Sequence, residues 1–144
     1  MAKMIYINLP VSDLARSTAF YQAIGAVKNE QFSDNVTCSS IVFSDTIHAM
    51  LMTHEKYRYF TDKKIADPKT MSQVLICLFV DSRQAVDDMI GKAKAAGGNL
   101  DPSPQDNFDF MYGRSFEDPD GHMWGVSWMD AEAAAKAMAA AADA

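Results

Sequence analysis

The sequence predicts an α+β fold in a single domain, made of two copies of one β-α-β-β unit. Its length of 144 residues suits one domain with its own core. Short apolar, strand-like runs alternate with two helix-like segments along the chain. Val11 and Val80 occupy equivalent places, each directly after a predicted strand and directly before a helix cap. This indicates an internal duplication of about 70 residues.

The first copy is expected to occupy residues 1–54. Pro10 cannot donate in a strand ladder, so it marks the end of the first strand. Ser12 and Asp13 offer N-cap oxygens to a helix that Gly25 ends. The predicted elements are a strand over 4–9, a helix over 13–24, a short extra strand within 27–32, and strands over 36–43 and 47–53 that form a hairpin.

The second copy, over residues 72–129, repeats this plan. Asp81 or Ser82 can cap a helix that carries an apolar stripe and ends at Gly97. The turn from Asp118 to Gly121 combines Pro, Asp and Gly, which a tight hairpin turn needs. The predicted elements are a strand over 74–80, the capped helix, a polar loop over 101–109, and strands over 110–116 and 123–128.

Two segments lie outside the copies. The connection over 55–71 is charged and aromatic, with Tyr57, Tyr59 and Phe60 among Lys and Arg. It is either a surface connection whose aromatic residues pack on the edge of the domain, or a lid that closes on a ligand. The Ala-rich stretch over 130–144 predicts a last helix capped by Asp130.

Composition excludes several classes of function. The net charge is −6 and the 13 Lys and Arg form no run, which disfavours a nucleic-acid partner. No apolar stretch reaches the roughly 18 residues that span a bilayer, and no signal-peptide pattern is present, so we expect a cytoplasmic protein with no membrane partner. Cys38 and Cys77 lie in apolar stretches and favour buried thiols over a disulfide or a metal site.

Two motifs carry a resemblance to a known family. Residues 9–17, Leu-Pro-Val-Ser-Asp-Leu-Ala-Arg-Ser, with Phe20-Tyr21 after them, are similar to the opening segment of vicinal oxygen chelate proteins. Residues 116–122, Phe-Glu-Asp-Pro-Asp-Gly-His, resemble their late hairpin turn. This superfamily includes glyoxalase I, bleomycin-resistance proteins and extradiol dioxygenases. The chain most resembles small bacterial proteins labelled as predicted lactoylglutathione lyases or glyoxalase-like proteins.

The resemblance implies two β-α-β-β-β modules that form a curled mixed sheet around a cleft, often completed by homodimerisation. In metal-dependent members, four side chains in that cleft hold a divalent ion, two from each module. The corresponding positions here are Tyr6, Met50 (to within one residue), Leu75 and Gly125. A neutral phenol ligates poorly and a thioether is too soft for such an ion, while the other two side chains cannot coordinate. We therefore expect no metal and no cofactor at this site.

A relocated metal site is the alternative, because the chain has three histidines, His48, His54 and His122. His48 shares a strand face with Met50 and Met52 and could point into the cleft. Single histidines at strand ends are, however, usually solvated or hydrogen-bonded.

Strand alternation predicts an apolar cleft with a few polar groups, suited to a small aliphatic or partly aromatic ligand. The same side chains could instead pack against each other and fill the cleft. The expected lining residues are Tyr6, Asn8, His48, Met50, Met52, Leu75, Cys77, Ser115, Met123, Gly125 and Ser127.

Three functions are compatible with these observations. The first is a metal-independent binder of a small molecule. The second is an enzyme of the lyase, isomerase or dioxygenase type with relocated ligands or acid–base residues, for which Tyr6, His48 and Glu117 are the candidates. The third is a dimeric interaction module with a vestigial cleft. A small-molecule ligand and a homodimer are the expected partners.

Overall fold

The computed structural model describes residues 2–143 and has two mixed β-sheets, one from each half of the chain. The first half contains β1 (Ile5–Val11), α1 (Leu14–Ala23), β2 (Val27–Asn29), the 3-10 helix η1 (Glu30–Phe32), β3 (Cys38–Val42) and β4 (Ile47–Thr53). The second half contains β5 (Ile76–Phe79), α3 (Arg83–Ala95), β6 (Asn99–Leu100), β7 (Asp106–Phe108), β8 (Met111–Glu117) and β9 (Met123–Met129). A short helix, α2 (His54–Arg58), begins the connection between the halves, and α4 (Ala131–Ala142) ends the chain.

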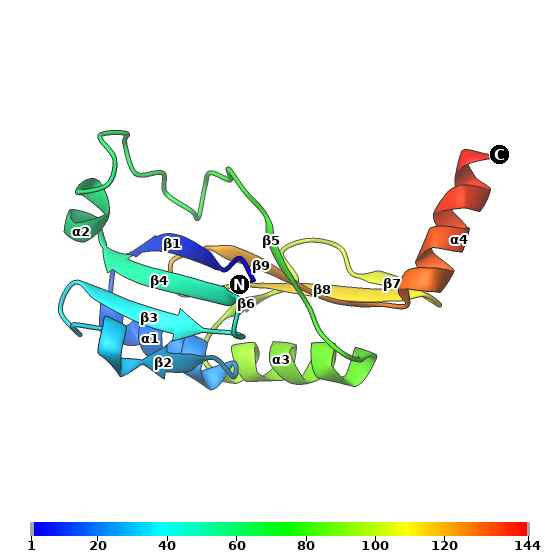
Figure 1. The fold of residues 1–144 in the computed structure, drawn as a ribbon, viewed down its shortest axis with the longest axis horizontal. Coiled ribbons are helices and arrows are strands. Elements are labelled where there is room, and N and C mark those ends of the chain that lie inside the picture. The colour runs from blue at the N-terminus through cyan, green and yellow to red at the C-terminus, as the bar shows by residue number, and fades with distance from the viewer. Residues whose placement is uncertain (1, 144) are drawn as a thin grey trace.

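The two sheets repeat one topology. Their strand orders are β1-β4-β3-β2 and β5-β9-β8-β6, with β7 paired to β8. In each sheet the first strand of the copy runs parallel to its last strand, and the other pairs are antiparallel. Both α1 and α3 lie on one side of the sheets, while the connection arches over the other side and α4 projects away at one end (Figure 1). The predicted fold class and duplication are confirmed, but among residues 2–143 no strand pair joins the two sheets.

The helix caps follow the predicted chemistry. The side chain of Asp13 accepts a hydrogen bond from the backbone of α1, and Ser82 does the same for α3. Gly25 and Gly97 end these helices at φ of 110° and 89°, which favour glycine. Asp130 caps α4 as expected. Residues 1 and 144, which the predictions for the first copy and the last helix include, lie outside the described residues.

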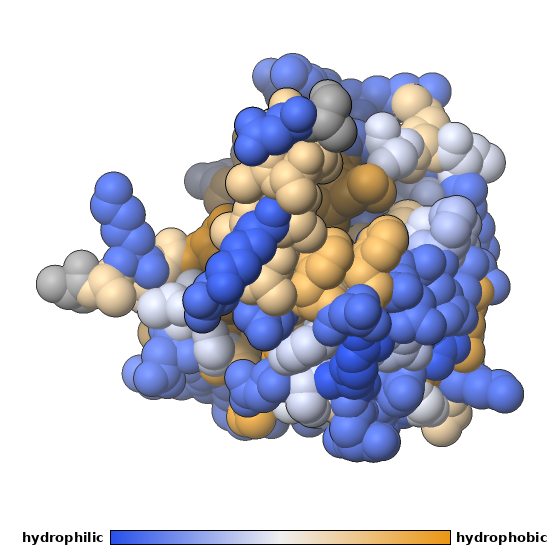
Figure 2. Space-filling model, turned by 90° about the vertical axis from the view of Figure 1, so that its right-hand side faces the viewer, coloured by the Kyte–Doolittle hydropathy of each residue, from blue (hydrophilic) through white to orange (hydrophobic). Residues whose placement is uncertain are grey.

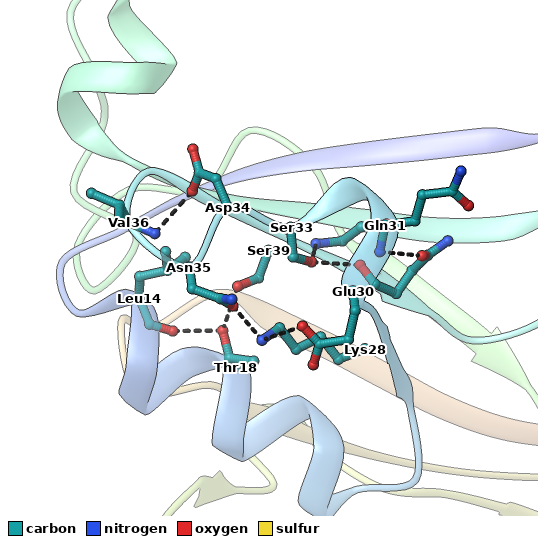
Figure 3. Close-up of polar contacts among 12 residues, drawn as sticks. Leu14, Thr18, Lys28, Glu30, Gln31, Ser33, Asp34, Asn35, Val36 and Ser39 are labelled. Carbon is teal, nitrogen blue, oxygen red and sulfur yellow. Dashed lines mark hydrogen bonds and ion pairs between the residues drawn. The ribbon is translucent and has the colours of Figure 1, made fainter.

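The loop between β2 and β3 is held by its own polar side chains (Figure 3). Asp34 accepts hydrogen bonds from the backbone of residues 36–38 and from the Thr37 hydroxyl. These bonds, the one from Thr37 foremost, hold the pKa of Asp34 well below its usual range. Ser33 Oγ donates to the Asn29 carbonyl and accepts from the Ser40 backbone. The loop is therefore an ordered edge of the first sheet.

The core joins the two halves. The aromatic rings of Phe20 and Tyr21 on α1 pack beside Phe116 and Trp124 of the second sheet, and all four are buried. The Tyr21 hydroxyl donates to Asp118 Oδ2 at 2.6 Å and accepts from Trp124 Nε1 at 3.0 Å. Burial and the neighbouring Asp118 raise the pKa of Tyr21 well above its usual value. The first helix thus packs directly on the second module.

Three local predictions need correction. The first strand continues through Pro10 to Val11, because β1 lies at a sheet edge, where a residue without an N–H is tolerated. The connection begins with a helical turn, α2, because the Thr53 side chain accepts from the Lys56 backbone. The loop after α3 contains β7, a three-residue strand on the edge of β8 that is too short to show alternation. No helix within residues 2–143 has the length and apolar character to cross a bilayer.

Candidate functional site

Each sheet has one face toward the helices and an opposite face, which we call the inner face. On the helix side lie Leu9 and Leu51 of the first sheet and Trp124 and Val126 of the second, all buried in one cluster. Alternation therefore gives the inner face to Tyr6, Asn8, Met50, Met123, Gly125 and their neighbours in register.

Each module contains two of the four positions that correspond to family metal ligands, and the two positions are spaced in the same way in both modules. Met50 pairs with Asn8, two residues after Tyr6, and Gly125 pairs with Cys77, two residues after Leu75. Because this spacing of two residues is equal in both modules, it supports Met50, rather than an adjacent residue, as the position that corresponds to the second metal ligand.

These four positions carry a phenol, a thioether, an alkyl group and no side chain, so they do not fit a divalent ion. Tyr6 instead stacks on His48 with 4.6 Å between ring centroids, and Leu75 is 71% exposed just before β5. Within residues 2–143, no group of three or more His, Cys, Asp or Glu is arranged to hold a metal ion.

A cavity lies where the end of β1 meets the start of β9, beneath the connection. Its volume is about 590 Å³, which is within the usual range of small-molecule pockets. The sheets contribute Asn8, Leu9, Pro10, Glu117, Gly121, His122 and Met123. The connection contributes Tyr57, Thr61, Lys63, Lys64, Ile65, Ala66, Pro68, Lys69, Thr70, Met71, Ser72, Gln73 and Val74.

The connection is fixed against the turn between β8 and β9. Asp67 shapes a local turn, accepting from the backbone of Lys69 through its carboxylate and from Met71 through its carbonyl. Gly121 has a φ of 101°, and a Cβ built there would lie 2.9 Å from Lys69 Cγ and 3.0 Å from Lys69 N. Only glycine allows the backbone of the connection to approach so closely.

The same turn is bound to the first module by buried carboxylates. Asp118 Oδ1 accepts from the backbone N–H groups of residues 120, 121 and 122. Asp120 accepts from the Ser12 backbone at 2.8 Å, the Ser12 hydroxyl at 2.6 Å and the Ser17 hydroxyl at 3.2 Å. Burial raises the pKa of Asp118. These bonds hold the pocket wall in place.

His122 also has a structural partner. Its Nε2 lies 2.7 Å from the Pro10 carbonyl, so the ring links the turn to β1 at the rim of the pocket. The three histidines do not line one cavity: His122 lines the 590 Å³ pocket, His54 lines a second cavity of about 450 Å³, and His48 lies beside Tyr6 outside both.

Two buried polar atoms on the inner face of the first sheet have no hydrogen-bond partner among the residues that the structure describes. They are Ser40 Oγ and His48 Nδ1. His48 Nε2 lies 3.2 Å from the Asp45 carbonyl, which leaves Nδ1 as the free ring nitrogen. A buried polar atom without a hydrogen-bond partner lowers the stability of the fold, so this part of the sheet is suited to bind a polar ligand group or a water molecule.

Two of the eleven residues expected in the cleft, Asn8 and Met123, line the 590 Å³ pocket. The others are distributed along the inner faces outside it. Ser115 Oγ lies 3.0 Å from Ser103 Oγ, and Cys77 Sγ lies 3.5 Å from Ser127 Oγ. Cys77 is exposed rather than buried, because Gly125 beside it has no side chain to cover it. The remaining positions are His48 and Met52, which are buried, Met50 and Gly125, which are half-buried, and Tyr6 and Leu75, which are exposed.

The connection supplies most of the pocket lining, although none of its residues is among the eleven expected in the cleft. Tyr57 lines the pocket, whereas Tyr59 is 81% exposed and contacts Phe60 rather than the domain edge. The expectation that all three rings pack on that edge is therefore wrong for Tyr59. In the sequence, the mixture of charged and aromatic residues over 55–71 is compatible with a surface connection or a lid over a ligand, but it does not indicate which of its side chains face the pocket.

Comparisons with known proteins agree with this architecture. A sequence model described as Glyoxalase/Bleomycin resistance protein/Dioxygenase superfamily matches residues 3–126. A comparison with curated proteins found no match.

Solved structures with the same fold cover almost all of the chain. A hypothetical protein from S. aureus is 25% identical with a TM-score of 0.73, over 89% of this chain and 95% of that one. A glyoxalase/bleomycin resistance protein/dioxygenase family enzyme from Burkholderia phytofirmans PsJN is 22% identical with a TM-score of 0.70, over 89% and 99%. A lactoylglutathione lyase from Agrobacterium tumefaciens is 15% identical with a TM-score of 0.63, over 89% and 94%, and shows likeness of fold alone. With its duplicated modules and the match over residues 3–126, the chain belongs to the Glyoxalase/Bleomycin resistance protein/Dioxygenase superfamily.

Proposed function

We propose that this protein binds a small molecule without the divalent metal that metal-dependent relatives use. The observation that carries the proposal is the combination of a pocket of about 590 Å³ with four ligand positions whose side chains cannot hold such an ion. The ligand would lie beneath the connection, between the end of β1 and the start of β9.

The pocket is mixed in character, which suits a binding function. Met71, Val74 and Met123 offer flexible or branched apolar surface, while Asn8 and Glu117 offer polar groups from the two sheets. A few polar groups in an apolar pocket fix the orientation of a ligand, whereas its apolar area supplies most of the affinity.

The enzyme alternative has less support. Of its three candidate residues, only Glu117 lines the pocket, and its carboxylate accepts from the Asn99 amide at 3.0 Å. Tyr6 and His48 stack on each other, which supports a structural role for both rings. Glu117 and His122 both line the pocket, but each already has a structural partner: His122 Nε2 lies 2.7 Å from the Pro10 carbonyl, and Glu117 accepts from Asn99.

The proposal predicts that purified, dialysed protein contains no stoichiometric nickel, zinc, iron or manganese when measured by elemental analysis. The same preparation, screened against small molecules by thermal unfolding, should give ligands that raise the midpoint temperature, because a ligand that prefers the native state stabilises it. One tightly held transition-metal ion per chain would overturn the metal-independent assignment. A saturating screen with no stabilising compound would favour the interaction-module alternative.

We further propose that the protein forms a homodimer through the apolar surface at the α4 end. Viewed from that end, hydrophobic surface surrounds the helix (Figure 2). Phe79 is 59% exposed on the inner face, and Phe108, Met129 and Met138 are exposed as well. Contiguous exposed apolar surface of this kind is typical of an interface.

Analytical ultracentrifugation over a concentration series tests this proposal. Phe79→Glu should shift the protein toward the monomer, whereas Val36→Glu, a matched change at an exposed apolar residue on the β2–β3 loop, should not. A wild-type protein that stays monomeric at all concentrations would exclude the dimer.

A further inference from the structure

The pocket beneath the connection carries an excess of positive charge. Lys63, Lys64 and Lys69 line it, and Glu117 is its single carboxylate. The protein as a whole has a net charge of −6, yet residues 55–71 contain five Lys and Arg against three Asp and Glu. The positive charge is therefore concentrated on the segment that covers the pocket.

Among residues 2–143, no side chain forms an ion pair with these lysines. All ion pairs within residues 2–143 involve other basic side chains, namely Lys28, Arg114 and Lys136. The three acids of the connection, Glu55, Asp62 and Asp67, do not line the pocket, and Asp67 Oδ1 accepts from the Lys69 backbone. The three ammonium groups are thus free to pair with a ligand.

A second cavity, of about 450 Å³, shares part of this basic lining. Lys64 and Lys69 line both cavities, and the second one adds Arg58 and His54. Its two acids are Asp67 and Asp120, and the oxygens of Asp120 are already hydrogen-bonded to Ser12 and Ser17. Lys and Arg therefore outnumber Asp and Glu in the lining of both cavities.

Apolar surface lies next to these charges. Ile65, Met71 and Val74 come from the connection, and Met123 comes from β9. A ligand that satisfies both parts would have an apolar body against these side chains and a negative group toward the lysines. The three lysines are exposed, so water solvates them beside a neutral ligand, whereas an anionic ligand gains their attraction.

We propose that the pocket binds a small organic anion, with Lys63, Lys64 and Lys69 supplying the countercharge to a carboxylate, phosphate or sulfonate group. This inference rests on the proposed function and specifies the chemical class of its ligand.

The test uses two fluorescent probes with the same aromatic body. One is 1-anilinonaphthalene-8-sulfonate, which is an anion, and the other is N-phenyl-1-naphthylamine, which is neutral. Binding of the neutral probe reports on the apolar pocket alone, and the difference in affinity between the probes reports on the charge. The pocket variant changes Lys63, Lys64 and Lys69 to Gln. The control variant changes Lys92, Lys94 and Lys136 to Gln, an equal loss of charge at exposed positions outside the pocket.

Three charges about 7 Å from a sulfonate in water strengthen its binding about tenfold at an ionic strength of about 0.01 M and about threefold at about 0.15 M. The pocket variant should lose that factor for the anionic probe and keep its affinity for the neutral one. The control variant should change by less than twofold. Benzoate and phenyl phosphate, added as competitors, then show whether a carboxylate or a phosphate displaces the probe better.

Two results would overturn the inference while leaving the proposed function intact. One is equal binding of both probes, and the other is an equal loss of the anionic probe in the pocket and control variants. If neither probe binds to the folded wild-type protein, the proposed function fails and the inference fails with it.

Discussion

Replacing Tyr21 with phenylalanine removes one buried oxygen that serves two partners. The hydroxyl donates to Asp118 Oδ2 at 2.6 Å and accepts from Trp124 Nε1 at 3.0 Å, and the whole side chain is buried. The variant leaves a carboxyl oxygen and an indole N–H without that partner. A hydrogen bond to a charged group contributes about 1.5–3 kcal/mol, and an unsatisfied buried N–H costs about 1–3 kcal/mol. Because such effects are not fully additive, we expect a loss of about 3 kcal/mol in the free energy of unfolding.

Urea denaturation at pH 7, followed by tryptophan fluorescence and circular dichroism, measures this loss. For a domain of this size, about 3 kcal/mol corresponds to a fall of roughly 10 °C in the midpoint of thermal unfolding. The matched control is Tyr112→Phe, because the Tyr112 hydroxyl donates to Asp87 at 2.7 Å at the exposed surface. That change should cost less than about 1 kcal/mol, since water replaces the lost partner. A loss below about 1 kcal/mol for Tyr21→Phe, or equal losses in both variants, would refute the view that this hydroxyl joins the two modules.

Two further substitutions test other parts of the structure. The Arg114 side chain donates to Asp101 at 2.7 Å and lowers the pKa of that carboxyl. The pair therefore stabilises the fold fully at pH values above the unfolded pKa of Asp, about 3.9. This stabilisation is lost as the pH falls through the lower pKa of the folded state. Asp101→Asn should therefore cost about 1 kcal/mol at pH 7 and less at pH 3 in urea denaturation, and an equal cost at both pH values would contradict this. Gly121→Ala should cost about 2 kcal/mol, because φ there is 101° and the new Cβ would meet Lys69 at 2.9 Å. Gly121→Ala should also speed proteolysis of the connection. The control is Gly91→Ala in α3, where a new Cβ would meet nothing within 4 Å. This control should leave the cleavage rate unchanged and stabilise the helix by about 0.5–1 kcal/mol.

Local chemistry explains why most of the fold could be predicted. The strand over 47–53 was predicted with the observed bounds, since β4 lies in the middle of its sheet and most of its side chains are at least partly buried. The observed caps, Asp13 and Ser82, are each one of two adjacent candidates, Ser12 or Asp13 and Asp81 or Ser82, because a side-chain oxygen just before an apolar stripe favours an N-cap. α2 and β7 were missed, since a single helical turn and a three-residue edge strand are too short for a period to appear.

The candidate site was less predictable, because its wall depends on tertiary contact. Alternation assigns side chains to the two faces of a strand, and on that basis Asn8 and Met123 were expected in the cleft. The connection has no regular period after α2, so its position cannot be derived from a repeat. What fixes it is the close approach of Lys69 to Gly121, two residues that are 52 positions apart in the sequence.

The two motifs that carry the family resemblance, in residues 9–17 and 116–122, have a structural role. They can therefore show that the chain belongs to the family without showing that it binds a metal. Asp118 orders the turn and binds Tyr21, while Asp120 binds Ser12 and Ser17, so the late turn and the opening segment of the chain hold each other. None of these residues is one of the four positions at which metal-dependent relatives bind their ion. A chain can therefore keep the contacts that join its modules while those four positions carry side chains that do not hold a metal ion. The motif predicts the fold, and the chemistry of the pocket has to be determined from the residues that line it.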